Sequence, residues 1–169
     1  DVTVTGTTDA PPSGKLNALR ALPEVAAAEA MQHRYAFVGN DLQDLYGVRP
    51  QTIGDATPMS NAFFGNGNAA ATLAELARTP DGVLVSEETV QTYQLHQGDA
   101  LTLRLQHAGS HAYVPVKFRF IGVTREFPTA PKDSFLVANA SYVAAQTGAD
   151  AAEVVLLRTQ ARAIDAGAV

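Results

Sequence analysis

The pattern that most restricts the fold is a two-residue alternation of apolar and polar side chains in neighbouring segments. Residues 101–106 read LTLRLQ and residues 113–120 read YVPVKFRF. Successive side chains of a β-strand point to opposite faces, so this alternation predicts two strands that are each half buried. The turn-forming residues Ala108, Gly109 and Ser110 between them favour a hairpin. The chain must therefore fold around a β-sheet.

Shorter segments on both sides of this hairpin predict alternating strands and helices. Further strands are expected at residues 1–6, 34–38, 83–85, 134–138 and 153–158. The stretch from Val25 to Val38 reads as extended, but its alanines fit either a helix or a strand. Helices are expected at residues 15–22, 69–78, 86–95 and 139–146, and again from Thr159 onward. Ser86 and Asn139 precede two of these helices and are expected to cap them.

The segment from residue 39 to residue 68 lacks any regular pattern. It is rich in glycine, asparagine and proline, which favour turns. We expect an irregular segment with one helical turn formed by Leu42, Leu45 and Tyr46. Phe63 and Phe64 are expected to cover a hydrophobic surface. Long irregular segments in compact domains are usually functional or mobile.

Composition excludes several classes of function. The 169 residues include no cysteine, which excludes disulfides, thiolate metal sites and a cysteine nucleophile. A net charge of −5 argues against nucleic acid as a partner. No apolar run is long enough for a membrane-spanning helix. The chain begins at Asp1 without an initiator methionine or a signal peptide, and we expect it to be excised, either from a processed protein or from a longer one.

Three groups of residues offer chemistry, but each has a simpler interpretation. His107 and His111, with His96 nearby, have a spacing that can bind zinc, yet they lie on either side of a turn. Ser86 could serve a hydrolase together with a histidine, but it lacks the G-x-S-x-G sequence and is explained by helix capping. The glycine-rich residues 65–68 lack the lysine of a phosphate-binding loop. We assign no catalytic, cofactor-binding or metal-binding residue.

The loop between residues 126 and 133 is the strongest candidate for a contact with a partner. It contains Phe127, Pro128, Pro131, Lys132 and Asp133. Prolines restrict a loop before binding and so reduce the entropy that binding costs. The alternative is a rigid connector in which Phe127 packs inward.

Three sequence blocks together resemble a known family. Residues 22–28 read LPEVAAA, residues 82–105 read GVLVSEETVQTYQLHQGDALTLRL, and residues 118–123 read FRFIGV. These blocks resemble the extracytoplasmic, periplasmic-core-like domain of FtsX/MacB-type ABC transporter permeases. The corresponding family patterns are L-P-x-V-x-x-[AV], then V-x-[VIL]-[ST]-E followed by L-x-x-G-D-x-[LIV]-x-[LIV], and F-x-[VIF]-x-G-[VI].

The resemblance implies an α+β fold of the MacB periplasmic-core type. A βαβ-type lobe would be formed by both chain ends, residues 1–32 and 150–169. A β-rich lobe, residues 33–149, would be inserted between them in a single extracytoplasmic domain. The segment 46–68 and the loop 127–133 match no cargo-defining element of the family, so the cargo stays open.

The resemblance also implies a function without catalysis. Such a domain couples ATP-driven movement to export, extrusion or partner regulation outside the cell membrane, with the ATPase on a separate cytoplasmic subunit or domain. Its partners would be the flanking transmembrane helices of the same permease, indirectly the ABC ATPase, and an extracytoplasmic protein or lipid-linked cargo. The alternatives are a secreted or periplasmic module that binds a small ligand or glycan, and the Ser86 hydrolase.

Overall fold

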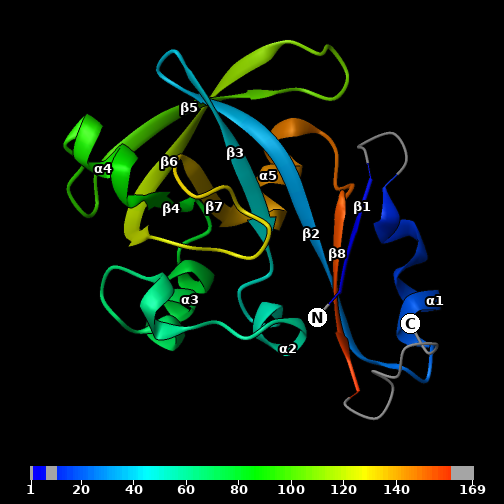
Figure 1. The fold of residues 1–169 in the computed structure, drawn as a ribbon. Helices are drawn as coiled ribbons and strands as arrows, with labels where there is room; N and C mark the ends of the chain where they lie inside the picture. Colours follow the sequence, from blue (N-terminus) through cyan, green and yellow to red (C-terminus); the bar gives the residue numbers. More distant parts are fainter. Residues whose placement is uncertain (1, 7–10, 161–169) are drawn as a thin grey trace.

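The computed structural model describes residues 2–6 and 11–160, which form an α+β fold (Figure 1). Its strands are β1 (Val2–Thr5), β2 (Val25–Val38), β3 (Asp41–Val48), β4 (Gly82–Ser86), β5 (Ala100–Gln106), β6 (Tyr113–Thr124), β7 (Phe135–Asn139) and β8 (Val154–Thr159). Its α-helices are α1 (Leu16–Arg20), α2 (Ile53–Ala56), α3 (Ala69–Arg78), α4 (Glu87–Tyr93) and α5 (Ala140–Thr147). Two 3₁₀ turns, η1 (Pro12–Lys15) and η2 (Asn61–Phe63), precede α1 and α3. The predicted fold class is confirmed, whereas the helix expected after Thr159 lies outside the described residues.

The long strand β2 belongs to two sheets. Its first half, up to Met31, pairs with β8, and β8 pairs with β1, which makes a three-stranded antiparallel sheet. From Gln32 onward β2 pairs with β3, and near its end Ala36 and Phe37 also pair with β5. This last pairing closes β2, β3, β7, β4, β6 and β5 into a six-stranded barrel. Figure 1 shows β2 running through the molecule from one sheet to the other.

We call the part formed by β1, β8 and residues 25–31 of β2 the terminal sheet. Val2 lies opposite Leu157, and Val25 lies opposite Thr159. The backbone N–H of Gln160 donates to the carbonyl oxygen of Glu24. The start of β1 and the end of β8 therefore leave the terminal sheet at the same end, which is the end farther from the barrel.

The predicted hairpin forms β5 and β6. Leu101 lies opposite Phe118 and Leu105 opposite Val114. Leu103, Leu105, Val116 and Phe118 are all buried in one hydrophobic cluster inside the barrel. The polar residues that alternate with them lie on the outer face.

Strand β3 replaces the helical turn expected at Leu42, Leu45 and Tyr46. A two-residue turn at Gly39 and Asn40 returns the chain onto β2, so that Val38 lies opposite Asp41. Leu45 and Tyr46 are adjacent in sequence, yet both are fully buried because both faces of the strand are covered. Strands covered on both faces do not show the alternation that identifies half-buried strands.

Three hydrophobic clusters hold the two sheets. The first fills the barrel, and the second lies between its outer face, α2, α3 and the terminal sheet. Phe64 is fully buried in this second cluster, as expected, and Phe63 packs against it. Met31, Val154 and Leu156 of the terminal sheet belong to the same cluster. The third cluster is small and lies between the terminal sheet and α1.

Ser86 and Asn139 precede helices as expected, but their side chains do not cap them. The Asn139 side-chain amide donates to the carbonyl oxygens of Leu76, Thr79 and Pro80, and thereby holds the end of α3. The two residues thus indicated correctly where α4 and α5 begin, but the predicted capping hydrogen bonds do not form. In the described residues, no helix is long and apolar enough to cross a lipid bilayer.

Candidate functional site

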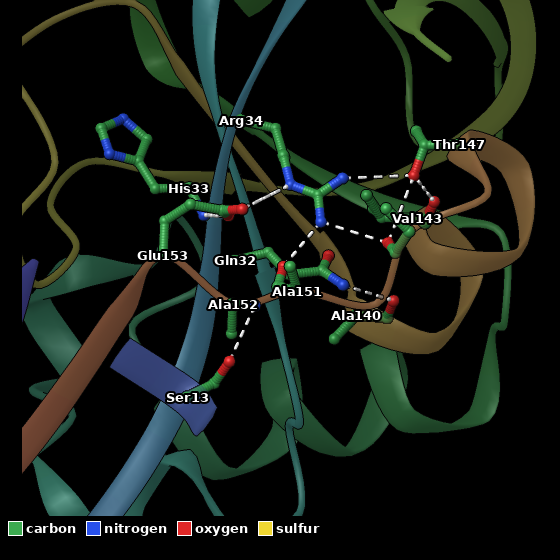
Figure 2. A network of polar contacts seen from close by, with 11 residues as sticks. Ser13, Gln32, His33, Arg34, Ala140, Val143, Thr147, Ala151, Ala152 and Glu153 are labelled. Carbon is green, nitrogen blue, oxygen red and sulfur yellow. Dashed lines mark hydrogen bonds and ion pairs between the residues drawn. The ribbon is translucent and has the colours of Figure 1, made fainter. Parts of the chain in front are cut away.

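The most extensive buried polar network lies where β2 passes from the terminal sheet to the barrel (Figure 2). Arg34 Nε donates to both carboxylate oxygens of Glu153, at 3.1 and 3.2 Å. Arg34 Nη1 donates to Thr147 Oγ1 at 3.2 Å, and Nη2 donates to the carbonyl oxygens of Ala149 and Ala151. The side chains of Arg34 and Glu153 are only 12% and 5% exposed. Removal of either partner from such a pair would leave a buried charge without compensation.

Neighbouring bonds attach the same segment of chain to β2. A Glu153 carboxylate oxygen accepts the backbone N–H of His33 at 2.9 Å. The Gln32 side chain donates to the carbonyl oxygen of Ala140 at the start of α5, and Ser13 Oγ accepts the N–H of Ala152. Figure 2 shows these contacts around the Arg34 guanidinium. We call this set of contacts the junction, because it joins β2 to the segment between α5 and β8.

A second group of contacting side chains connects His33, next to the junction, with Tyr46 on β3 and with the loop between β6 and β7. His33 Nε2 lies 2.7 Å from Asp44 Oδ2, and the His33 ring stacks on Tyr46 with centroids 4.8 Å apart. The Tyr46 hydroxyl donates to the carbonyl oxygen of Thr129 at 3.2 Å. Burial, and secondarily the nearby Asp44 carboxylate, raise the pKa of Tyr46 to about 12. The hydroxyl therefore stays protonated and donates at any physiological pH.

Tyr46 thereby fixes the base of the loop between β6 and β7. Phe127 packs inward, as the alternative interpretation of this loop expects: it is 5% exposed and its ring lies 6.3 Å from that of Tyr46. Thr129 has a φ of +66°, a strained value for a residue with a side chain. Pro128 is half-buried, and the remaining candidates of this loop, Pro131, Lys132 and Asp133, are exposed. The loop is thus held at its base and presents a polar tip.

The surroundings of Ser86 are not those of a catalytic nucleophile. Ser86 is 3% exposed, and its hydroxyl donates to Thr89 Oγ1 at 3.1 Å and accepts the N–H of Phe135 at 3.2 Å. These bonds tie α4 and β7 to β4. Within the described part of the chain, no histidine contacts this hydroxyl, so the geometry gives no support to a hydrolase.

The other two candidates have structural partners. His107 Nδ1 accepts the backbone N–H of Gly109 in the turn of the β5–β6 hairpin. Across residues 2–6 and 11–160, no group of three or more histidine, aspartate or glutamate side chains is placed to hold a metal ion. In the glycine-rich segment, the Asn68 side chain accepts the N–H of Ala71 and caps α3.

The fold resembles those of two solved extracytoplasmic domains. The extracellular domain of the noncanonic ABC-type transporter YknZ from Gram-positive bacteria has a TM-score of 0.58 to this chain, at 15% sequence identity. The match covers 96% of this chain and 84% of that domain. The periplasmic region of MacB from Actinobacillus actinomycetemcomitans has a TM-score of 0.54 at 13% identity, over 97% of this chain and 75% of that one.

By sequence, no protein-family model and no curated protein matches the chain. The structural likeness is at the level of the fold, because sequence identity is low. It confirms the fold that the three sequence blocks predict: the chain has the fold of the extracytoplasmic domains of YknZ and MacB.

Proposed function

We propose that this chain is the non-catalytic extracytoplasmic domain of an FtsX/MacB-type ABC transporter permease. It lies outside the cell membrane and carries ATP-driven movement to export, extrusion or partner regulation there, while a separate cytoplasmic subunit or domain hydrolyses ATP. The observation that carries the proposal is the match of 96% of the chain to most of the YknZ extracellular domain. The match covers 96% of this chain and 84% of that domain rather than one motif, and that supports a shared role.

The course of the chain supports a route for this movement. Transmembrane helices of the same permease would connect to the outer end of the terminal sheet, where β1 starts and β8 ends. In this proposal the terminal lobe, residues 1–32 and 150–169, receives the movement. The junction between Arg34 and Glu153 passes it to the inserted lobe, residues 33–149.

The loop from Phe127 to Asp133 is the proposed contact for an extracytoplasmic protein or a lipid-linked cargo. Its base is tied to β3 through Phe127 and through the bond from Tyr46 to Thr129. A loop that is fixed before binding loses less conformational entropy when a partner binds. Pro131, Lys132 and Asp133 are exposed and would make the contact.

Labelling of a single cysteine in the full-length protein tests this proposal. The 169 residues contain no cysteine, so Ala145→Cys, on the exposed face of α5, adds one defined thiol to this domain. We expect a membrane-impermeant maleimide to label it in intact spheroplasts, and the labelled protein to stay in the membrane fraction. Val143→Cys, on the buried face of the same helix, is the matched control and should react only after denaturation.

Two outcomes would contradict the proposal. Labelling of Ala145→Cys only after the spheroplasts are lysed would place the domain in the cytoplasm. A labelled protein that leaves the membrane in low-salt buffer would favour the alternative, a secreted or periplasmic binding module.

A further inference from the structure

A cleft of about 390 Å³ lies next to the junction, and the proposed function does not use it. It is bounded by β2, by the turn of the β5–β6 hairpin and by the end of α5. Tyr35, His107, His111 and Tyr113 are among the residues that line it. Sites for small molecules typically have volumes of about 300–1,000 Å³, so the cleft is large enough for one or two sugar-sized rings.

Two of the basic side chains that line this cleft are already paired with carboxylates. The Arg34 guanidinium is occupied by Glu153, Thr147 and two backbone carbonyl oxygens. The His33 ring is paired with Asp44. No aspartate or glutamate is among the described residues that line the cleft. A cationic ligand would find no carboxylate there and an anionic ligand no unpaired guanidinium, so the cleft favours a neutral ligand.

Two tyrosines of the cleft differ from the others in the chain. Tyr46, Tyr93 and Tyr142 each donate a hydrogen bond to a backbone carbonyl oxygen. Tyr35 and Tyr113 have no hydrogen-bond partner in the part of the chain that the structure describes, and they are 48% and 37% exposed. These two tyrosines therefore offer both an aromatic face and an unused hydroxyl.

Neighbouring rings hold the two tyrosines in place. The centroid of the Tyr35 ring lies 5.4 Å from that of the His33 ring, and the Tyr113 and Phe37 rings pack edge to face with centroids 5.0 Å apart. Rings that are already positioned lose little freedom when a ligand stacks on them.

His107 adds a hydrogen-bond donor at a ring nitrogen that the structure identifies as Nε2. Because its Nδ1 accepts the N–H of Gly109, the neutral ring carries its proton on Nε2. The ring also lies against Gly148, which has a φ of +77°; a Cβ there would stand 3.1 Å from His107 Nε2. Only glycine both adopts this φ without strain and leaves room for the ring.

We propose that this cleft binds a neutral saccharide built of pyranose rings. The two flat faces of such a ring expose C–H groups, which pack against aromatic rings such as those of Tyr35 and Tyr113. Its hydroxyl groups accept and donate hydrogen bonds, for which both tyrosine hydroxyls and His107 Nε2 are available. Its lack of charge suits a cleft that has no carboxylate in its described lining and whose arginine is already paired.

Titration of the 169-residue chain with cellotetraose and with tetra-N-acetylchitotetraose, both neutral, tests the proposal. We expect heat of binding in calorimetry, and NMR shifts of the Tyr35 and Tyr113 ring protons but not of those of Tyr93. Tyr35→Ala and Tyr113→Ala should each weaken binding about three- to tenfold, as expected for the loss of one stacked ring. Tyr93→Ala is the matched control, because Tyr93 is similarly exposed but lies outside the cleft.

Three results would overturn the proposal. The first is the absence of heat and of ring-proton shifts for both sugars. The second is binding that neither tyrosine substitution weakens. The third is tighter binding of a charged tetrasaccharide, such as tetraglucosamine or tetragalacturonate, than of the neutral ones. The ring-proton shifts need no substitution, so the test holds even if a variant fails to fold. None of these outcomes bears on the membrane location of the domain.

Discussion

The barrel and the terminal sheet share β2 but differ in what stabilises them. In the barrel each strand has a neighbour on both sides, and a large cluster of buried side chains fills the interior. The terminal sheet has three strands, and its outermost described strand is the short β1. Among the described residues, only Ala28, Val155 and Leu157 are buried in the cluster beneath α1. On its other face the terminal sheet buries Met31, Val154 and Leu156 in the cluster that it shares with the barrel, so its packing depends on the barrel.

This difference assigns a specific role to the junction. β2 connects the two parts along one strand, and the junction adds a connection between β2 and the segment that leads into β8. A domain that transmits movement needs such a second connection, because a single strand can bend or twist. The predictions below separate the contribution of the junction from that of ordinary packing.

The largest effect is expected from Arg34→Met. Removal of the guanidinium leaves the Glu153 carboxylate buried without its partner, which should lower the free energy of unfolding by about 3–5 kcal/mol. Urea unfolding of the 169-residue chain measures this loss. Hydrogen exchange should become faster in β1 and β8 before it does in β5 and β6.

Two variants serve as controls for this prediction. Arg104→Met removes an exposed arginine that lies over the Phe37 ring and should cost about 1 kcal/mol or less. The double variant Arg34→Met/Glu153→Leu removes both charges and should recover most of the loss. A loss below about 1 kcal/mol for Arg34→Met would show that the junction does not hold the terminal sheet.

A smaller and more local effect is expected from Tyr46→Phe. This change removes the hydroxyl that donates to Thr129 and leaves the carbonyl oxygen without that donor, which should cost about 1–2 kcal/mol. The amide of Ala130, which donates to Phe127, should exchange faster, while amides inside the barrel do not change. Tyr142→Phe, which removes a more exposed hydroxyl bond to Lys117, is the control. Equal exchange at Ala130 in both variants would refute the role of Tyr46.

The third prediction concerns pH and the terminal sheet. Glu29 is buried on β2, and burial raises the pKa of its carboxyl above 4.5, although the Thr52 hydroxyl and Arg49 act in the opposite direction. The folded state therefore binds the proton more tightly than the unfolded state. Stability falls as the pH rises from the ordinary pKa to the raised one, and the loss persists above it.

Glu29→Gln should remove this dependence. The variant should be more stable than the original chain at pH 7, and the difference should shrink as the pH falls and the carboxyl of the original chain takes up its proton. Thermal unfolding at a series of pH values measures the difference. Parallel pH profiles of the variant and the original chain would contradict the prediction.

The sequence predicted the elements whose patterns are local. The alternation in residues 101–106 and 113–120 identified β5 and β6, because each has one buried and one exposed face. Strand β3 was not predicted, since Leu42 is exposed, Gln43 is buried and both faces beyond it are covered. Gly47 has no side chain and therefore adds neither an apolar nor a polar residue to the pattern of β3. Glycine leaves room there for the Gln32 side chain, because a Cβ would stand 2.0 Å from Gln32 Oε1.

The junction could not be predicted because its partners are far apart in the sequence. Arg34 and Glu153 are separated by 119 positions, and either could be a surface residue. The pairing of β2 with β5 that closes the barrel is equally remote. One local signal was present: Glu153 directly precedes an apolar run, where an acidic residue needs a partner if it is buried. For the loop after β6, the sequence indicated an inward Phe127 as an alternative, but not the bond from Tyr46 to Thr129.

The central claim is that the terminal sheet and the barrel move together, so that movement at the outer end of the terminal sheet reaches the loop after β6. A spin-label distance between the two parts tests it most directly. Thr3→Cys on β1 and Thr102→Cys on β5 provide exposed sites in a chain without other cysteines. We expect a single narrow distribution of distances between the two labels when Arg34 is unchanged, and a broad distribution when the chain also carries Arg34→Met. A broad distribution with Arg34 present, or no broadening in the variant, would contradict the claim.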